Sequence, residues 1–182
     1  MTNSSHSNVL IIGGGCAGIS VASRLHSLKS DLNISIIEPS EKSLYQAAWT
    51  LVGAGAYDVG STVKQMSEVM PSYVKWIKEY AEEFMPETNS VKTNNGTYTY
   101  DYLVVCPGLK LNFDGVAGLK EHLGKNNVCT NYSAEMATYT WECLKNLDGG
   151  TLLFTEPPMP IKCAGAPQKI AYLAADHLKK KG

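Results

Sequence analysis

The stretch NVLIIGGGCAGISVASRLHSLKSDLNISIIE, residues 8–38, decides how this chain begins to fold. Its first five residues are a short apolar run that leads into a glycine-rich turn and then into a segment, 19–29, of helical character. A second apolar run, 32–38, ends in an acidic residue. This order predicts a βαβ unit with two parallel strands. We therefore expect an α/β protein that starts with a Rossmann-like domain.

The glycine turn carries the pattern G-x-G-x-x-G on Gly13, Gly15 and Gly18. The pattern alone is weak, but here it follows an apolar strand, opens a helix and precedes Glu38 at the end of the second strand. In a dinucleotide-binding fingerprint the glycines let a pyrophosphate approach the helix N-terminus, and the acidic residue accepts hydrogen bonds from a ribose hydroxyl. The sequence therefore predicts a dinucleotide site, with a purely structural glycine turn as the alternative.

Further strands are expected between residues 71 and 108. The segment PSYVKWIKEYAEEFMPE, 71–87, predicts a strand that runs into a turn. Residues 90–108, SVKTNNGTYTYDYLVVCPG, predict a hairpin with Asn95-Gly96 at its tip. The second arm of this hairpin reads as a buried strand that Pro107-Gly108 closes.

The last third of the chain predicts a helix, a strand, a loop and a second helix. Residues 133–147 form the first helix, with Ser133 as its N-cap. The run GGTLLFT, 149–155, predicts the strand, and Pro167 is expected to open the final helix.

This order predicts two domains. Residues 1–148 are expected to form the dinucleotide-binding domain, and residues 149–182 the first strand, loop and helix of a second Rossmann-like domain. One βα unit cannot bury both faces of a parallel sheet. We therefore expect the chain to be truncated, a part of a longer protein.

Composition narrows the function classes. A net charge of −1 argues against nucleic-acid binding, which needs a basic surface. No apolar run approaches the roughly 18–20 residues that span a bilayer, and the polar opening MTNSSHSN lacks the features of a signal or transit peptide. A bacterial or archaeal cytoplasmic chain fits best, with a processed organellar chain as the alternative. The basic run LKKKG, 178–182, reads as a solvated helix end.

Five cysteines are present: Cys16, Cys106, Cys129, Cys143 and Cys163. None forms a C-x-x-C pair, so neither a zinc site nor a thioredoxin-like motif is predicted, and we expect no metal. For four of them the default interpretation is a small buried hydrophobic residue. Cys163 differs, because it stands in a loop beside Lys162 and shortly before a helix that carries Lys169. Nearby lysines and a helix N-terminus favour the thiolate form, which makes Cys163 the candidate nucleophile.

The place where a second dinucleotide loop would be expected, after TLLFT, reads EPPMPIKCAGAP instead. A glutamate, three prolines and a cysteine do not form a cradle for a second pyrophosphate. The electron donor is therefore not expected to be NADH, and a sulfur nucleophile stands at that place.

Three stretches closely resemble sulfide:quinone oxidoreductases, which are FAD-dependent flavoproteins of the pyridine nucleotide-disulfide oxidoreductase type. They are YQAAWTLVGAG (45–55), CTNYSAEMATYTWE (129–142) and PIKCAGAPQKIAY (160–172), and the resemblance covers nearly the whole chain. It implies that Cys163 carries sulfane sulfur as a persulfide, that sulfide gives two electrons to FAD, and that a membrane quinone receives them. It also implies FAD contacts at Gly13, Gly15, Cys16, Ala17, Gly18, Glu38, Gln46, Ala81 and Gly108.

Cys129 is the second candidate catalytic sulfur, because some branches of the resembled family have a cysteine near the flavin at this position. A small filler residue is the alternative interpretation. Ser43 and Ala47 stand where many relatives have a histidine and a proline, so proton-transfer roles there are not expected. The family's second redox cysteine, its last FAD-binding segment and its membrane anchor would lie beyond residue 182.

The resemblance favours the N-terminal portion of a sulfide:quinone oxidoreductase that is inactive as 182 residues alone. Alternatives are a flavocytochrome-type sulfide dehydrogenase, an NADH:quinone reductase, or a truncated FAD-binding module without catalysis. The resemblance implies that sulfide and quinone are the partners. The full-length protein is then expected to be a peripheral homo-oligomer on the cytoplasmic face of a bacterial or archaeal membrane, with this fragment soluble.

Overall fold

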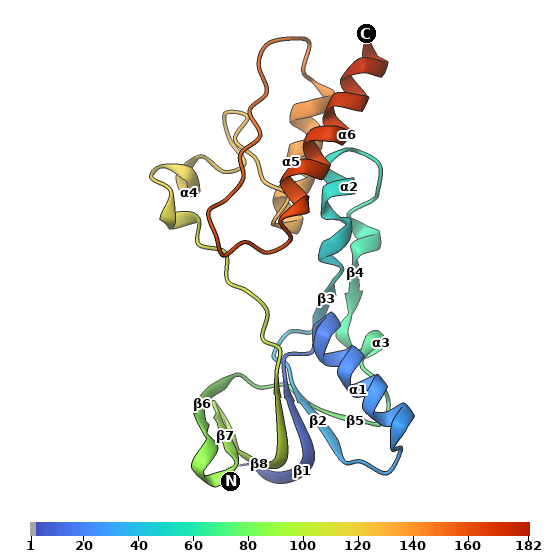
Figure 1. Cartoon of the computed structure of the whole chain (residues 1–182), viewed down its shortest axis with the longest axis vertical. Helices are drawn as coiled ribbons and strands as arrows, with labels where there is room; N and C mark the ends of the chain where they lie inside the picture. The colour runs from blue at the N-terminus through green and yellow to red at the C-terminus, as the bar shows by residue number, and fades with distance from the viewer. Residues whose placement is uncertain (1–2) are drawn as a thin grey trace. The chain divides into compact units, whose positions relative to one another are not determined.

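The structure, a computed structural model, describes residues 3–182, which divide into two compact units (Figure 1). The first unit contains the chain up to residue 43 together with residues 64–108, and the second contains residues 44–63 and 109–182. A separate two-stranded sheet consists of β3 (Lys42–Leu44) and β4 (Val63–Gln65), which contain two of the three points at which the division falls along the chain. The α/β class predicted from the sequence is confirmed.

A six-stranded sheet forms the first unit. Its strands are β1 (Asn3–Ile12), β2 (Ile34–Ile37), β5 (Val74–Ile77), β6 (Ala81–Met85), β7 (Ser90–Thr93) and β8 (Gly96–Val105), in the order β5-β2-β1-β8-β7-β6. β1 pairs in parallel with β2 and β8, and β2 pairs in parallel with β5. β6, β7 and the start of β8 form an antiparallel meander. The carboxyl ends of the four parallel strands therefore share one edge of the sheet.

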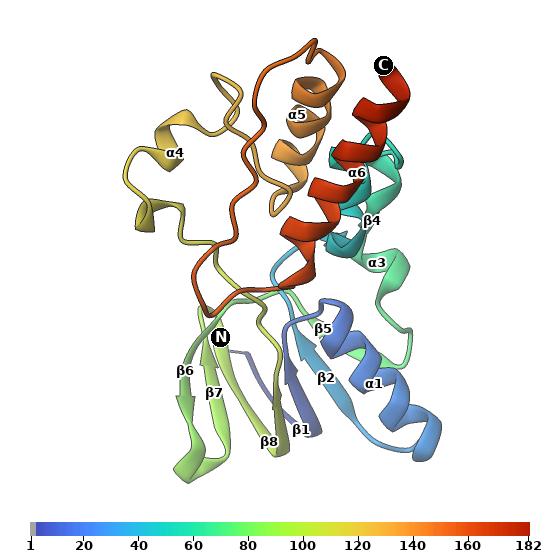
Figure 2. The same ribbon diagram turned by 45° about the horizontal axis from the view of Figure 1, so that its top comes forward.

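Two apolar layers hold this sheet, because alternate residues of a strand point to opposite faces. On one face, Val9 and Ile11 of β1 pack with Ala22 of helix α1 (Cys16–Leu28), which covers the parallel strands (Figure 2). On the other, Leu10 and Ile12 pack against side chains of the meander. The βαβ unit predicted from residues 8–38 is confirmed.

β1 is longer than the apolar run 8–12 predicted, since it begins at Asn3. The polar residues that precede the apolar run find partners in neighbouring strands. The Ser7 and Ser35 hydroxyls, both buried, lie 2.6 Å apart. Because buried polar groups that are hydrogen-bonded carry little free-energy penalty, a polar segment can extend a parallel strand.

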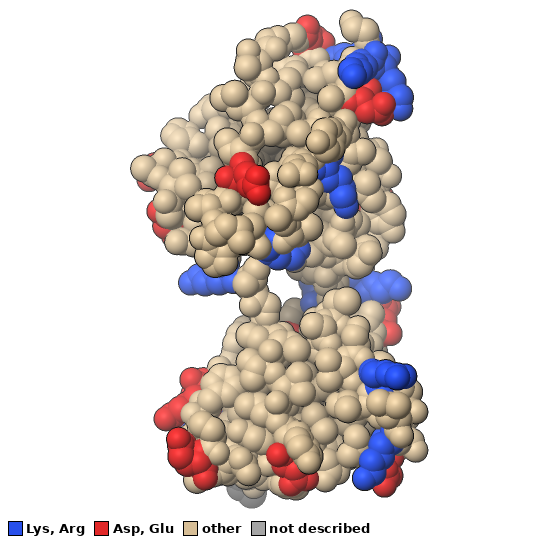
Figure 3. Space-filling model, in the orientation of Figure 1, with Lys and Arg blue, Asp and Glu red and all other residues tan. Residues whose placement is uncertain are grey.

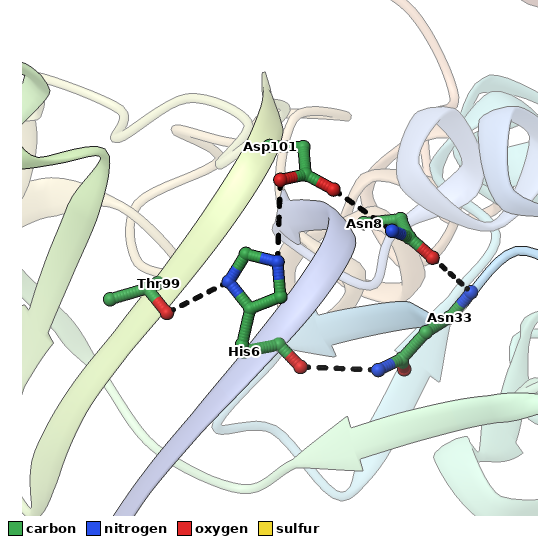
Figure 4. A network of polar contacts seen from close by, with 5 residues as sticks. All are labelled: His6, Asn8, Asn33, Thr99 and Asp101. Carbon is green, nitrogen blue, oxygen red and sulfur yellow. Dashed lines mark hydrogen bonds and ion pairs between the residues drawn. The ribbon is translucent and has the colours of Figure 1, made fainter.

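Exposed polar side chains at the start of β1 also form hydrogen bonds with neighbouring segments (Figure 4). The His6 ring bonds Thr99 at 3.0 Å and pairs with Asp101 at 3.3 Å. Asn8 donates to Asp101, and its amide oxygen accepts from the backbone of Asn33. The network joins β1, β8 and the loop before β2.

The predicted hairpin is confirmed. β7 and β8 pair antiparallel, and residues 94–95 lie between them, so Gly96 is the first residue of β8 rather than part of the tip. The Asn94 side chain accepts a hydrogen bond from the backbone of Tyr80, which anchors the tip to the start of the meander. Short helices α3 (Met66–Val69) and η3 (Pro86–Thr88) complete the first unit.

The second unit is helical. Its elements are η1 (Gln46–Ala48), α2 (Trp49–Gly53), η2 (Gly60–Thr62), η4 (Phe113–Gly115), α4 (Leu119–His122), α5 (Ala134–Lys145) and α6 (Gly165–Lys181). α2 packs against both α5 and α6. Leu144 of α5 meets Ile170 and Ala174 of α6, so these long helices lie side by side. The helix predicted over 133–147, with Ser133 at its N-cap, is confirmed.

The strand predicted over 149–155 is wrong for this structure. Residues 151–158 have no regular secondary structure, and Leu153 is 85% exposed. A strand needs a neighbour for its backbone groups, and neither sheet of the described residues pairs with this segment. The boundary predicted between residues 148 and 149 concerns the domains of a longer protein and stays a prediction.

The basic end of α6 is more than a solvated helix terminus. The Lys181 ammonium donates to the carbonyls of Lys145 and Leu147, at 3.2 and 2.7 Å, and pairs with Asp148 at 2.8 Å. It therefore caps the carboxyl end of α5, where unpaired carbonyls and the helix dipole attract a cation. The hydrogen bond and charge of Lys181 hold the pKa of Asp148 below its usual value. Figure 3 shows lysines gathered at this end of α6.

Candidate functional site

The glycine turn follows β1 directly, and its first glycine lies where no other residue fits. Gly13 has φ +97°, and a Cβ there would lie 2.1 Å from the carbonyl oxygen of Cys106. Gly13 donates its N–H to Ile37 at 2.9 Å, and Cys106 donates its own to Ile12 at 2.7 Å. The loop is therefore fixed between the ends of β2 and β8.

Helix α1 opens toward free space. Gly15 is its N-cap, and a Cβ there would have nothing within 4 Å. Cys16 and Ala17, the first helical residues, are exposed, whereas a Cβ on Gly18 would lie 1.9 Å from the Gly13 carbonyl oxygen. Gly18 thus allows close packing of the helix on the loop. No side chain caps the first turn of α1, so its N–H groups are available to an anion such as a pyrophosphate.

Glu38 lies beside this loop, at the carboxyl end of β2. One carboxylate oxygen accepts from Gly14 N–H at 2.8 Å and the other from Ser40 N–H at 2.7 Å. A Cβ on Gly14 would lie 2.8 Å from the Glu38 side chain, so the central glycine of the turn makes room for the acid. Each carboxylate oxygen keeps a second lone pair, which suits the predicted contact with ribose hydroxyls.

Gly108 and Ala81 belong to the same unit. Gly108 has φ +78° and follows β8, and a Cβ there would have nothing within 4 Å. Ala81 begins β6, is half-buried and packs against the sheet core. The structure therefore brings the glycine turn, Glu38 and Gly108 to the carboxyl edge of the parallel strands, where open α/β sheets bind ligands. Gln46, the first residue of η1, belongs to the second unit, so its contact with FAD stays a prediction.

Cys163 lies in the second unit, exposed, and one residue before the N-cap of α6. The helix begins at Gly165, two residues earlier than the predicted start at Pro167, so the thiol is nearer to the helix N-terminus than expected. Cys163 has φ +56°, which is uncommon for a residue with a side chain and is typical of functional sites. Its carbonyl accepts from Ala166 N–H at 2.9 Å, which ties this conformation to the first turn of the helix.

Tyr132 is a further residue of this loop that the sequence did not indicate. Its hydroxyl donates to the Cys163 carbonyl at 3.3 Å. Burial, followed by the negative charges of Cys163 and Glu156, raises the pKa of Tyr132. The tyrosine therefore remains a neutral donor at physiological pH. No local pattern joins residues 31 positions apart, and only the fold reveals the contact.

The other sequence-predicted thiol, Cys129, is a half-buried free cysteine in the loop before α5. Lys162 is half-buried and Lys169 is exposed on α6. Among residues 3–182, no group of three or more His, Cys, Asp or Glu side chains is placed to hold a metal ion. Within the same range, no helix is both long and apolar enough to cross a membrane.

Comparison with known proteins supports the interpretation of the glycine turn and Glu38 as a dinucleotide site. The family described as pyridine nucleotide-disulphide oxidoreductase matches residues 7–138, which include the glycine turn and Glu38. The chain belongs to this family. The family's match extends from β1 into α5, so it covers most of the first unit and part of the second.

Within the pyridine nucleotide-disulphide oxidoreductases, relatives that match nearly the whole chain are named as sulfide:quinone oxidoreductases. The mitochondrial sulfide:quinone oxidoreductase of Dictyostelium discoideum is 46% identical over 177 residues, which are 96% of this chain and 39% of that protein. That of Mus musculus is 40% identical over 182 residues, 100% of this chain and 40% of the relative. The X-ray structure of the sulfide:quinone oxidoreductase from Aquifex aeolicus superposes with a TM-score of 0.74 at 28% identity, over 98% of this chain and 40% of that one.

The resemblance to sulfide:quinone oxidoreductases is therefore confirmed. The chain spans about two fifths of the length of these relatives.

Proposed function

We propose that this chain supplies the FAD-binding loop and the sulfur-carrying cysteine of a sulfide:quinone oxidoreductase. The observation that carries the proposal is the position of Cys163, an exposed thiol in a left-handed conformation directly before the N-cap of a long helix. The thiolate of a cysteine is the form that attacks sulfur, and an exposed thiol is accessible to sulfide. The sulfide:quinone oxidoreductases of Dictyostelium discoideum and Mus musculus, at 46% and 40% identity, support this interpretation.

FAD fits the loop of the first unit. The open space at Gly15, the uncapped start of α1 and the carboxylate of Glu38 suit a pyrophosphate and a ribose. When bound, FAD would act as the acceptor of two electrons from sulfide and would pass them to quinone. The proposed contacts are Gly13, Gly15, Cys16, Ala17, Gly18, Glu38, Gln46, Ala81 and Gly108.

Cys163 is the proposed site of sulfide oxidation. A Cys163 thiol and one H₂S give a persulfide, two protons and two electrons: a bond forms between Sγ and the sulfide sulfur, and one S–H bond breaks on each. Tyr132 holds the backbone of this loop through the Cys163 carbonyl. Cys129 is proposed as a second catalytic sulfur.

Sulfide and a membrane quinone are the proposed partners, and a peripheral homo-oligomer is the proposed assembly. The sequence favoured a bacterial or archaeal membrane. Three of the relatives are named as mitochondrial proteins, so we propose a quinone-containing membrane without assigning it to a bacterium or an archaeon.

An anaerobic sulfide titration of the FAD-loaded full-length protein that contains this chain, followed by flavin absorbance, tests the proposal. We expect sulfide to bleach the flavin, a short-chain quinone to restore it, and Cys163→Ser to abolish the bleaching. Met159→Ser is the matched control, because Met159 is a sulfur-containing residue of the same loop and is 79% exposed. Bleaching by NADH without any response to sulfide would replace the proposal with an NADH:quinone reductase.

A further inference from the structure

A tight turn precedes Cys129. Lys125 and Val128 form an antiparallel bridge, and Asn126 and Asn127 between them have φ of 51° and 62°. Two consecutive left-handed residues are typical of a type I′ turn, and asparagine is one of the few residues with a side chain that favours them. The turn therefore fixes the direction in which the chain enters Cys129.

One face of α5 holds this turn at two points. Asn127 donates its N–H to the Tyr139 hydroxyl at 3.2 Å, and its side-chain oxygen lies 3.8 Å from Sγ of Cys143. Tyr139 and Cys143 are four positions apart, so they lie on the same side of the helix, one turn from each other. The chain two residues beyond Asn127 is thereby kept next to Cys143.

This arrangement brings Cys129 near enough to Cys143 for the two thiols to interact, and both cysteines also act on Tyr139, which binds the backbone of Asn127. Burial raises the pKa of the Cys143 thiol, a hydrogen bond from Tyr139 opposes the rise, and the charge and hydrogen bond of Cys129 add to it. Both cysteines are free and half-buried, so a small reagent can reach them. Neither the FAD loop nor the proposed chemistry of Cys163 uses Cys143.

We propose that Cys129 and Cys143 form an oxidisable dithiol that closes into a disulfide with a small-molecule disulfide such as oxidised glutathione. One cysteine attacks the glutathione disulfide and releases one glutathione thiol. The other cysteine then attacks the mixed disulfide and releases the second. An S–S bond forms in the protein, the S–S bond of the reagent breaks, and the two protein hydrogens end on two glutathione molecules. The product links the loop before α5 to the helix.

The test treats the native chain with oxidised glutathione in the absence of oxygen, alkylates the remaining thiols with iodoacetamide and maps every cysteine by mass spectrometry. We expect wild type to yield a peptide pair joined through Cys129 and Cys143, with neither of these two cysteines alkylated, whatever happens at the exposed thiols of Cys16 and Cys163. In Cys143→Ser, Cys129 should instead carry glutathione, and in Cys129→Ser, Cys143 should do so.

Cys163→Ser is the matched control and should form the same linkage as wild type. Separate glutathione adducts on Cys129 and Cys143, a linkage of Cys129 to Cys163, or two thiols that remain free would each overturn the proposal. A variant that fails to fold is recognised by its far-ultraviolet circular dichroism, and the wild-type linkage then still decides the outcome. The inference does not depend on FAD or sulfide, so the flavin titration can fail while this test succeeds.

Discussion

Replacement of Gly15 by alanine should remove dinucleotide binding and leave the fold intact. Gly15 has φ −73° and ψ −172°, an extended conformation that alanine adopts readily, and the new methyl group meets nothing within 4 Å. Alanine is a poorer N-cap than glycine, at a cost of about 1 kcal/mol or less. The loss of chain freedom in the unfolded state restores about 0.4–1 kcal/mol. The net change in the free energy of unfolding should therefore be close to zero.

Binding should change much more, because the methyl group enters the space through which a pyrophosphate would approach the first turn of α1. Displacing the phosphates removes about two charge-assisted hydrogen bonds, each worth about 1.5–3 kcal/mol. The total of about 3–6 kcal/mol corresponds to a dissociation constant for FAD raised by roughly 100-fold to 10,000-fold.

Gly18→Ala is the contrasting variant. Its Cβ would lie 1.9 Å from the Gly13 carbonyl oxygen, so the helix must move away from the loop. Overpacking of this kind costs about 1–3 kcal/mol, and urea unfolding should show the loss. Flavin fluorescence titration and urea unfolding of both variants separate the two effects. Wild-type affinity for FAD in Gly15→Ala, at unchanged stability, would refute the assignment of the pyrophosphate to this loop.

Three further outcomes follow from individual contacts. The negative charge of Cys163 contributes to the raised pKa of Tyr132, so Cys163→Ser should lower that pKa toward its ordinary value. An ultraviolet pH titration, with Tyr132→Phe as the reference, would measure the change. An unchanged pKa would contradict the contact between the two residues. Lys181→Met should cost about 0.5–1 kcal/mol and speed amide hydrogen exchange at the end of α5, and wild-type exchange there would argue against a capping role. Ser7→Ala and Ser35→Ala should each cost about 1–3 kcal/mol in urea unfolding, whereas the double variant should cost less than their sum; simple additivity would contradict the buried bond.

Much of the first unit could be predicted from the sequence, because its signals are local. The glycine turn, its flanking apolar runs and Glu38 lie within residues 8–38, and the structure places them together at one edge of the sheet. The hairpin at 90–108 likewise has its own turn residues, and in the second unit the helix predicted at 133–147 has Ser133 at its N-cap position. Each element could be recognised without knowledge of what packs against it.

The errors have non-local causes. The segment 149–155 is apolar enough for a strand. A strand also needs a neighbouring strand to pair with, and the sequence of the segment itself does not show whether one is present. Polar residues before 8 concealed the true length of β1, since their partners lie in β8 and β2. Pro167 predicted a helix that starts at its own position, whereas α6 begins two residues earlier, at Gly165. Pro167 then lies in the first turn of the helix, where backbone N–H groups have no partner within the helix, so its missing N–H costs nothing.

Because α6 starts at Gly165, Cys163 lies closer to the helix N-terminus than the sequence predicted. From the sequence, four residues separated the thiol from the expected helix, and the helix dipole acts mainly within the first turn. In the structure, Cys163 directly precedes the N-cap, and its carbonyl accepts hydrogen bonds from both Ala166 and Tyr132. The helix therefore fixes the backbone of the residue whose side chain the proposed chemistry uses. A substitution that frees this loop should impair sulfur transfer at Cys163 even if the thiol itself is kept.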